Sequence, residues 1–112
     1  MELKRTPLAS HTLIPAWPVA ALKSVKLEFH PGQKTGLHFH PMPVVGFVAE
    51  GAFIVQEEGG GERRYEKGEI VLEPAHVKML RFDNASPTRP ATLIATYLVR
   101  DEADKLIEFL EA

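Results

Sequence analysis

The chain has no cysteine and no long apolar run. The absence of Cys among its 112 residues excludes disulfides and thiolate metal ligands, and it is typical of proteins in a reducing compartment. No window approaches the ~18 apolar residues of a membrane span, and residues 1–5 do not lead into the apolar stretch of an export signal. We therefore expect a cytoplasmic protein that is neither exported nor embedded in a membrane.

The charges show no strong excess of one sign. Thirteen Lys and Arg against fifteen Asp and Glu leave a formal net charge of -2, and the cationic residues are scattered along the chain. A surface that binds nucleic acid concentrates its cations on one face, so we expect no nucleic acid partner. Two common catalytic motifs are also missing. No Ser lies in a Gly-x-Ser-x-Gly turn, and Gly59–Gly61 does not open a helix as a phosphate loop would.

Short strands dominate what is present. A length of 112 residues, 45% of them hydrophobic, suits a single domain over residues 1–112 with one core. Val25, Leu27 and Phe29 alternate with polar residues, as in a strand with one buried face. Other apolar runs between turn formers predict strands at 44–48, 52–55, 70–72, 77–82 and 91–99, with Glu50–Gly51 and Gly59–Gly61 as hairpin turns. We predict an all-β sandwich or closed barrel over about residues 12–99, because such sheets hide their edges by curling.

The last dozen residues follow a helical period instead. Ala103, Leu106, Ile107 and Leu110 recur at i, i+3, i+4 and i+7, and Asp101 can cap a helix that begins after it. We predict a short C-terminal amphipathic helix at about residues 102–111. It would cover one open side of the barrel or pack against a second subunit, and we favour the first role.

His38 and His40 form the candidate chemical site. Residues two apart on a strand point to the same side, so both imidazoles would project together while Leu37 and Phe39 face away. Two imidazoles on a rigid strand can chelate a divalent ion such as Zn, Cu, Ni or Fe. The same pattern also occurs as ordinary polar surface, so its sequence context has to decide between the two interpretations.

The sequence around these histidines resembles the small cupin proteins. The first cupin motif runs Gly, five residues, His-x-His, three or four residues, Glu, six residues, Gly. Gly32, His38, His40 and Gly51 fall in register with it, and Val44 stands at the Glu position. The resemblance implies a double-stranded β-helix, or jelly-roll barrel, with a divalent metal ion (Zn, Ni, Fe, Mn or Cu) held by His38 and His40. Similar cupins are frequently homodimers, and we expect a homodimer here.

The second cupin motif is only partly matched. It runs Gly, five residues, Pro-x-Gly, two residues, His, then Asn. Gly68, Pro74 and Asn84 match it, but His76 replaces the second Gly and Met79 replaces the His. The likeness covers about residues 22–99. It therefore indicates the fold more completely than it indicates the metal ligands.

Four residues remain as pocket candidates beside the two histidines: Met79, His76, Arg81 and Val44. Met79 is either a thioether ligand or an apolar filler of the barrel, and we favour the filler. His76 has the wrong strand parity for the site and lies at the rim unless a bulge or loop intervenes. Arg81 shares the parity of Met79, so we expect its guanidinium to point inward toward an acidic ligand, with a local salt bridge as the alternative. Glu73 lies ~20 Å from Met79 along an extended strand, so we place it on the surface.

Two functions are consistent with the sequence. One is a metal-dependent enzyme that leaves open metal positions for a small substrate. The other is a non-catalytic barrel that binds a small ligand as a sensor or storage module, with or without metal. A carboxylate within reach of His38 would favour the enzyme, because it supplies charge balance, whereas a dry and apolar pocket would favour the module.

Overall fold

The computed structural model describes residues 2–111, which form β-strands joined by turns and loops and contain no helix. The prediction of an all-β fold is confirmed. No helix that could cross a membrane is present among these residues. The strands are β1 (Ala21–Phe29), β2 (His38–Phe39), β3 (Val44–Glu50), β4 (Ala52–Glu57), β5 (Arg63–Glu66), β6 (Ile70–Glu73), β7 (Met79–Asn84), β8 (Ala91–Val99) and β9 (Glu108–Phe109).

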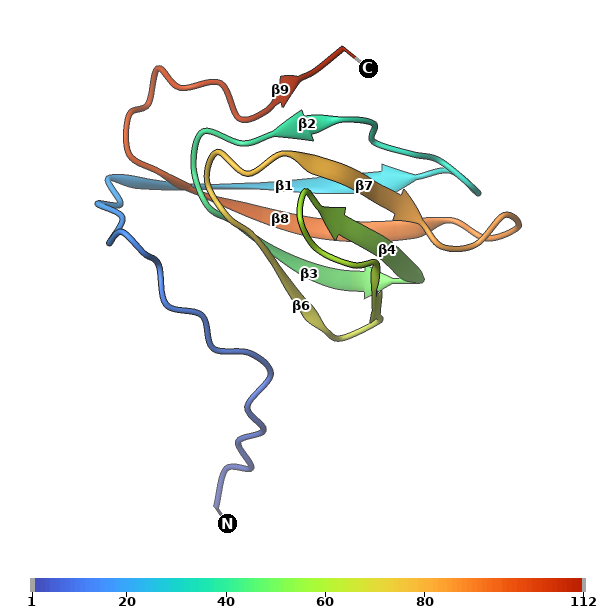
Figure 1. The fold of residues 1–112 in the computed structure, drawn as a ribbon. Coiled ribbons are helices and arrows are strands. Elements are labelled where there is room, and N and C mark those ends of the chain that lie inside the picture. The colour runs from blue at the N-terminus through green and yellow to red at the C-terminus, as the bar shows by residue number, and fades with distance from the viewer. Residues whose placement is uncertain (1, 112) are drawn as a thin grey trace.

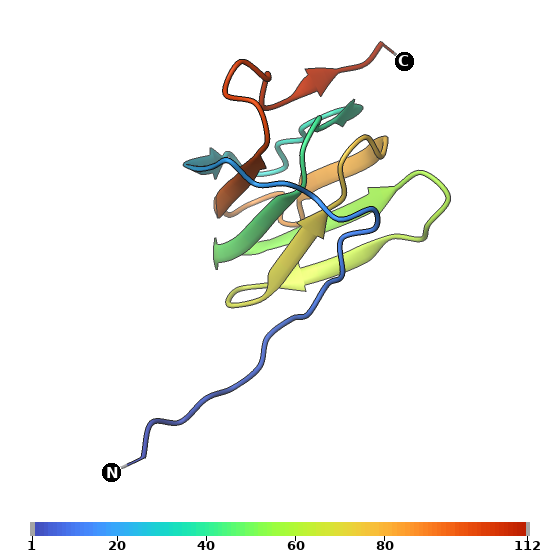
Figure 2. The same ribbon diagram turned by 90° about the vertical axis from the view of Figure 1, so that its left-hand side faces the viewer.

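Two antiparallel sheets face each other and enclose the core (Figure 1). The four-stranded sheet has the order β1-β8-β3-β6, and the five-stranded sheet has the order β5-β4-β7-β2-β9. β8 pairs with β1 over the full length of both strands. Figure 2 shows the two sheets from the side, with the N-terminal segment leading away from them. The sheets therefore form a barrel-like sandwich whose two inner faces meet.

Strict alternation along β8 shows how the sequence fills this core. Ala91, Leu93, Ala95, Tyr97 and Val99 are buried, while the residues between them are half-buried on the outer face. The opposite sheet contributes Phe53, Val55, Met79 and Phe82 to the same core cluster. Phe53 packs edge-on against Phe29 with ring centroids 4.9 Å apart, a geometry that aromatic pairs favour.

The turn at Glu50–Gly51 does not make a hairpin. β3 pairs with β6 and β8, whereas β4 pairs with β5 and β7, so the chain changes sheets at this point. The prediction was wrong because a tight turn between two apolar runs is equally compatible with a corner of a sandwich. The Gly59–Gly61 loop does join an antiparallel pair, β4 and β5, as predicted.

The predicted helix at residues 102–111 is not formed. Asp101 accepts a hydrogen bond from the backbone N–H of Ala103 and makes one turn, but the chain then becomes extended. Within this segment the short strand β9 pairs with β2, and the N–H of Leu110 donates to the carbonyl of Leu37. These tertiary hydrogen bonds override a helical periodicity that spans only about two turns, because short helices are only marginally stable on their own.

We predict that Gly51→Ala destabilises the fold by about 1–3 kcal/mol. Gly51 has a φ of +74°, and an added Cβ would lie 2.9 Å from the Cβ of Ala91 and 3.0 Å from the carbonyl oxygen of Pro90. Gly61→Ala is the control, because nothing lies within 4 Å of the added Cβ and the backbone shows no positive φ. Urea unfolding of the two variants measures the difference. Equal midpoints would contradict this account of the sheet-changing turn.

Candidate metal centre

β2 brings His38 into the barrel, and His40 follows directly after it. The two side chains are almost fully buried, with exposed fractions of 1% and 3%. Their rings lie edge to face with centroids 5.0 Å apart. The strand parity inferred from the sequence therefore holds, because residues two apart project to the same side.

Both imidazoles are oriented by backbone carbonyls. Nδ1 of His38 lies 2.8 Å from the carbonyl oxygen of Gly36, and Nδ1 of His40 lies 2.6 Å from the carbonyl oxygen of Leu106. A carbonyl can only accept, so each Nδ1 carries the proton and donates. Each neutral ring consequently presents the lone pair of Nε2 to the barrel interior. Leu106 belongs to the segment that was expected to be helical, so the C-terminal segment orients one of the two histidines.

Glu73 faces both Nε2 atoms. One carboxylate oxygen lies 3.1 Å from Nε2 of His38, and the other lies 3.2 Å from Nε2 of His40. The placement of Glu73 on the surface was wrong, since its exposed fraction is 5%. The ~20 Å separation from Met79 assumed one extended strand. In the structure β6 and β7 lie in different sheets, and the chain reverses between them, with His76 at a φ of 61°.

The register of β3 and β6 explains how Glu73 reaches the site. Val44 and Glu73 are directly opposite each other in this antiparallel pair, so their side chains share a face. Val44 occupies the position where the cupin motif has its Glu. The carboxylate therefore enters the same part of the barrel from the neighbouring strand. The sequence signal would have been a buried-strand glutamate before a turn at Pro74, which is recognisable only once the strand pairing is known.

The three side chains have the spacing of a metal-ligand set. Their donor atoms all lie within 4.8 Å of one another, and all three residues are buried. Ligand atoms about 2.1 Å from one ion, at angles of 90–109°, stand about 3.0–3.4 Å apart. The two contacts of Glu73 fall in this range. Two lone pairs facing a carboxylate also require a proton or a cation between them, so the donor set fits a divalent metal ion.

The protonation equilibria follow from the same contacts. Burial acts to raise the pKa of Glu73, but the hydrogen bonds that Nε2 of His38 and of His40 donate when they carry a proton outweigh burial and hold that pKa below its usual 4.5. Burial acts to lower the pKa of His40, but the hydrogen bond and charge of Glu73 outweigh it and raise the pKa above 6.5. Without a metal ion, Glu73 therefore favours the protonated form of His40, in which a proton lies where the cation would.

A cavity of about 220 Å³ opens beside the three side chains. Most of its wall is apolar, and its lining includes Leu27, Phe29, Thr35, Phe82, Leu93, Ala95, Tyr97, Ile107 and Phe109. Burial and the charge of Glu73 raise the pKa of the Tyr97 phenol above 10.0, so it remains an O–H donor at neutral pH. Ile107 and Phe109 come from the C-terminal segment, which closes one side of the cavity.

The other pocket candidates lie outside this cavity. Val44 is a buried core residue, and Met79 is buried opposite His38 in the register but lines a different cavity. His76 is exposed in the turn after Pro74, where its backbone N–H donates to the carbonyl of His40. Its ring lies 6.3 Å from that of Trp17. His76 therefore supports the site through its backbone and not as a third imidazole.

Arg81 does not point into the barrel. Its guanidinium bonds to Asp83 at 2.6 Å and to Glu62, which is the local salt bridge given as the alternative. The parity argument failed because the register of β7 against β4 shifts between Arg81 and Met79. Met79 and Phe82 are both buried although they lie an odd number of positions apart, at i and i+3, which is the effect of a β-bulge.

The cupin domain family matches residues 25–97, which is well over half of the chain. The chain belongs to the cupin family. No curated protein sequence matches this cupin. A cupin-like protein from Thermotoga maritima is 26% identical with a TM-score of 0.67, and the alignment covers 80% of this chain and 64% of that one. An RmlC-like cupin from Shewanella frigidimarina is 29% identical with a TM-score of 0.59, covering 72% and 69%.

An enzyme also shares the fold. A DMSP lyase from Ruegeria pomeroyi is 19% identical with a TM-score of 0.65, and the alignment covers 79% of this chain but 42% of the lyase. This cupin thus spans less than two thirds of the Thermotoga protein and under half of the lyase. At that identity the likeness to the lyase concerns the fold alone.

We predict that His40 and Glu73 stabilise the metal-free protein most between about pH 4.5 and 6.5. The contribution of His40 is fully present below its unfolded pKa of 6.5 and is lost as pH rises through its higher folded pKa. The contribution of Glu73 is present above 4.5 and is lost as pH falls through its lower folded pKa. The difference in Tm between chelator-treated wild type and His40→Ala measures this contribution. It should shrink from about pH 6 to pH 8, and a difference that stays constant or grows would refute the assignment.

Proposed function

We propose that this cupin binds one divalent metal ion through Nε2 of His38, Nε2 of His40 and the carboxylate of Glu73. The observation that carries the proposal is the orientation of both imidazoles by backbone carbonyls, which directs two unprotonated nitrogens at one buried carboxylate. Second-shell hydrogen bonds of this kind commonly fix the tautomer of metal-ligating histidines. The carboxylate also offsets half of the ionic charge, so burial of the ion becomes less costly.

Two imidazoles and one carboxylate form a three-ligand set that leaves metal positions open. Such a set is found in non-haem iron(II) enzymes, and related His and carboxylate sets hold catalytic zinc. A bound ion would supply Lewis-acid polarisation of a ligand oxygen or activation of water. The residues of this chain orient that ligand and exclude bulk water from it. We therefore propose a metal-dependent enzyme that acts on a small molecule.

The cavity defines the kind of ligand. Its volume of about 220 Å³ is below the ~300 Å³ at which drug-sized pockets begin, so the ligand is small. One end of the ligand meets the metal ligands and the Tyr97 phenol, while Phe29, Leu93 and Phe109 contact the remainder. We infer a compact molecule with one oxygen-bearing polar end and an apolar body. The phenol of Tyr97 donates a hydrogen bond to that polar end.

A non-catalytic binding module is the second candidate, because apolar side chains dominate the cavity wall. The carboxylate within reach of His38 is the feature that favours the enzyme. The DMSP lyase shows that this fold can support catalysis. At 19% identity, its substrate cannot be assigned to this cupin.

We predict that purified protein holds close to one equivalent of Fe, Mn, Ni, Cu or Zn. Incubation with each ion, followed by desalting and elemental mass spectrometry, measures the stoichiometry. His38→Ala with His40→Ala, and separately Glu73→Ala, should lose the metal, since each change removes donor atoms. His76→Ala is the matched control and should retain the metal, because its exposed ring lies outside the cavity. If the wild type takes up none of the five ions, the metal proposal fails.

We predict that deletion of residues 106–112 weakens metal binding by about 10–100-fold, the usual effect of losing an outer-shell partner. The deletion removes the carbonyl that accepts from His40 and the strand that pairs with β2. Deletion of residues 2–8, which do not line the cavity beside His38, His40 and Glu73, is the control. Competition with a fluorescent chelator gives the affinities. Equal affinities for both truncated proteins would contradict the role of the C-terminal segment.

A further inference from the structure

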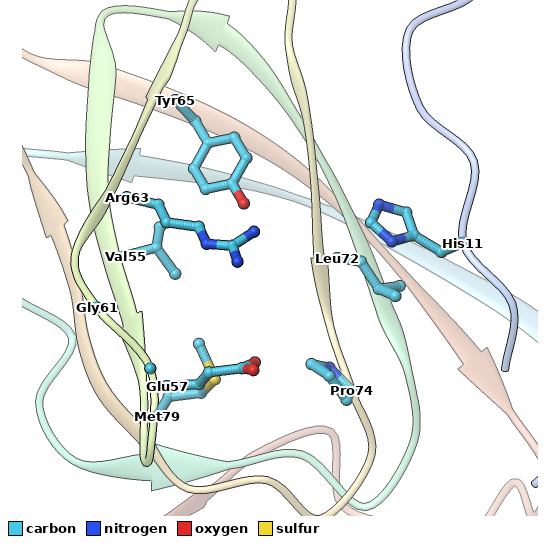
Figure 3. Close-up of a pocket in the computed structure, with 10 residues that line it drawn as sticks. His11, Val55, Glu57, Gly61, Arg63, Tyr65, Leu72, Pro74 and Met79 are labelled. Atoms are coloured by element: carbon cyan, nitrogen blue, oxygen red, sulfur yellow. The ribbon is translucent and has the colours of Figure 1, made fainter. Parts of the chain in front are cut away.

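A second cavity lies where the edges of the two sheets meet. It has a volume of about 190 Å³ and is bordered by β5 and the end of β4 on one side and by the end of β6 on the other. It shares no lining residue with the cavity of the metal centre. Figure 3 shows the side chains of Arg63, Tyr65 and Glu57 directed into this space. It is therefore a separate site with its own polar groups.

The register explains why a guanidinium and a phenol point into it. Arg63 is directly opposite Val55, and Tyr65 is directly opposite Phe53. Val55 and Phe53 are core residues with exposed fractions of 6% and 0%. Side chains that are opposite each other in an antiparallel pair share a face, so Arg63 and Tyr65 project toward the inside of the sandwich. β5 is the edge strand of its sheet, so the guanidinium stays open to solvent there.

The charged side chains that line this cavity form no ion pairs within the part of the chain that the structure describes, although charged residues next to them in the sequence do. Arg64 pairs with Glu66, and Lys78 pairs with Glu58. In contrast, the polar side chains that line the cavity take part in no ion pair and no side-chain hydrogen bond among residues 2–111. These side chains are Arg63, Tyr65, Glu57 and His11. Arg63 and Glu57 have opposite charges and still do not pair with each other. A space remains between the two charges.

The remaining wall is apolar and lies close to the metal centre. Val55, Leu72, Pro74 and Met79 form it. Leu72 and Pro74 flank Glu73 in the sequence, and Met79 is opposite His38 in the register. Neighbours of the metal-site residues thus line this cavity, although the two cavities share no lining residue.

We propose that this second cavity binds a small zwitterion of the size of an α-amino acid. Its carboxylate bonds to the guanidinium of Arg63 and the hydroxyl of Tyr65, because guanidinium and carboxylate form charge-assisted pairs. Its ammonium group bonds to the carboxylate of Glu57, and a short apolar side chain contacts Leu72, Pro74 and Met79. A zwitterion satisfies both charges at once, whereas a simple anion leaves Glu57 unpaired beside it.

The test compares L-valine with two molecules that each keep one of its charges, isovalerate and isobutylamine. Titration of the full chain, followed by the NMR signals of the Met79 methyl and the Tyr65 ring, measures binding. We expect saturable shifts with L-valine and at least tenfold weaker binding of the other two. Arg63→Gln and Glu57→Gln should each weaken L-valine binding at least tenfold. Arg64→Gln, which removes the adjacent and paired guanidinium, should leave it unchanged.

Three outcomes would overturn the proposal. The first is that L-valine causes no saturable shifts. The second is that isovalerate binds as tightly as L-valine and Glu57→Gln has no effect on L-valine binding, and the third is that Arg64→Gln weakens L-valine binding as much as Arg63→Gln does. The His38→Ala, His40→Ala double variant separates this site from the metal centre. It should lose metal and still bind L-valine, so failure of one proposal leaves the other intact.

Discussion

Burial of the Glu73 carboxylate is the constraint on which the rest of the site depends. A charge that is 5% exposed must be matched by a partner, because an uncompensated buried charge costs several kcal/mol. His38 and His40 are the groups that face it. Their Nδ1 atoms are already engaged with carbonyls, so the match can come only from added protons or from a cation held among the three side chains. The metal proposal rests on this balance of charge.

The same constraint explains the arrangement of the surrounding chain. β6 must end at Glu73 so that the carboxylate lies beside Val44, and the turn that follows carries the chain into the other sheet. The C-terminal segment must stay extended because the carbonyl of Leu106 accepts from His40. β9 then pairs with β2 and places Ile107 and Phe109 over the cavity. Orientation of one imidazole and closure of the pocket thus depend on the same few residues.

The sequence predicts the local part of this structure and misses the long-range part. Alternation along Val25, Leu27 and Phe29, and the shared side of His38 and His40, follow from the two-residue period of a strand, so both could be inferred without any pairing. Glu73 could not be placed, because its position depends on which strands pair and on where the chain changes sheets. A bulge in β7 reversed the expectation for Arg81, and tertiary hydrogen bonds reversed it for the helix at residues 102–111.

In the proposed centre, one ion is held by Nε2 of His38, Nε2 of His40 and a carboxylate oxygen of Glu73. A crystal structure of the protein loaded with Mn²⁺ or Zn²⁺, with the ion located by its anomalous scattering, tests this arrangement most directly. The account predicts a single strong peak about 2.0–2.2 Å from Nε2 of His38, Nε2 of His40 and an oxygen of Glu73, with both Nδ1 atoms still on their carbonyls. An ion bound elsewhere, or a ring turned so that Nδ1 coordinates it, would contradict the account.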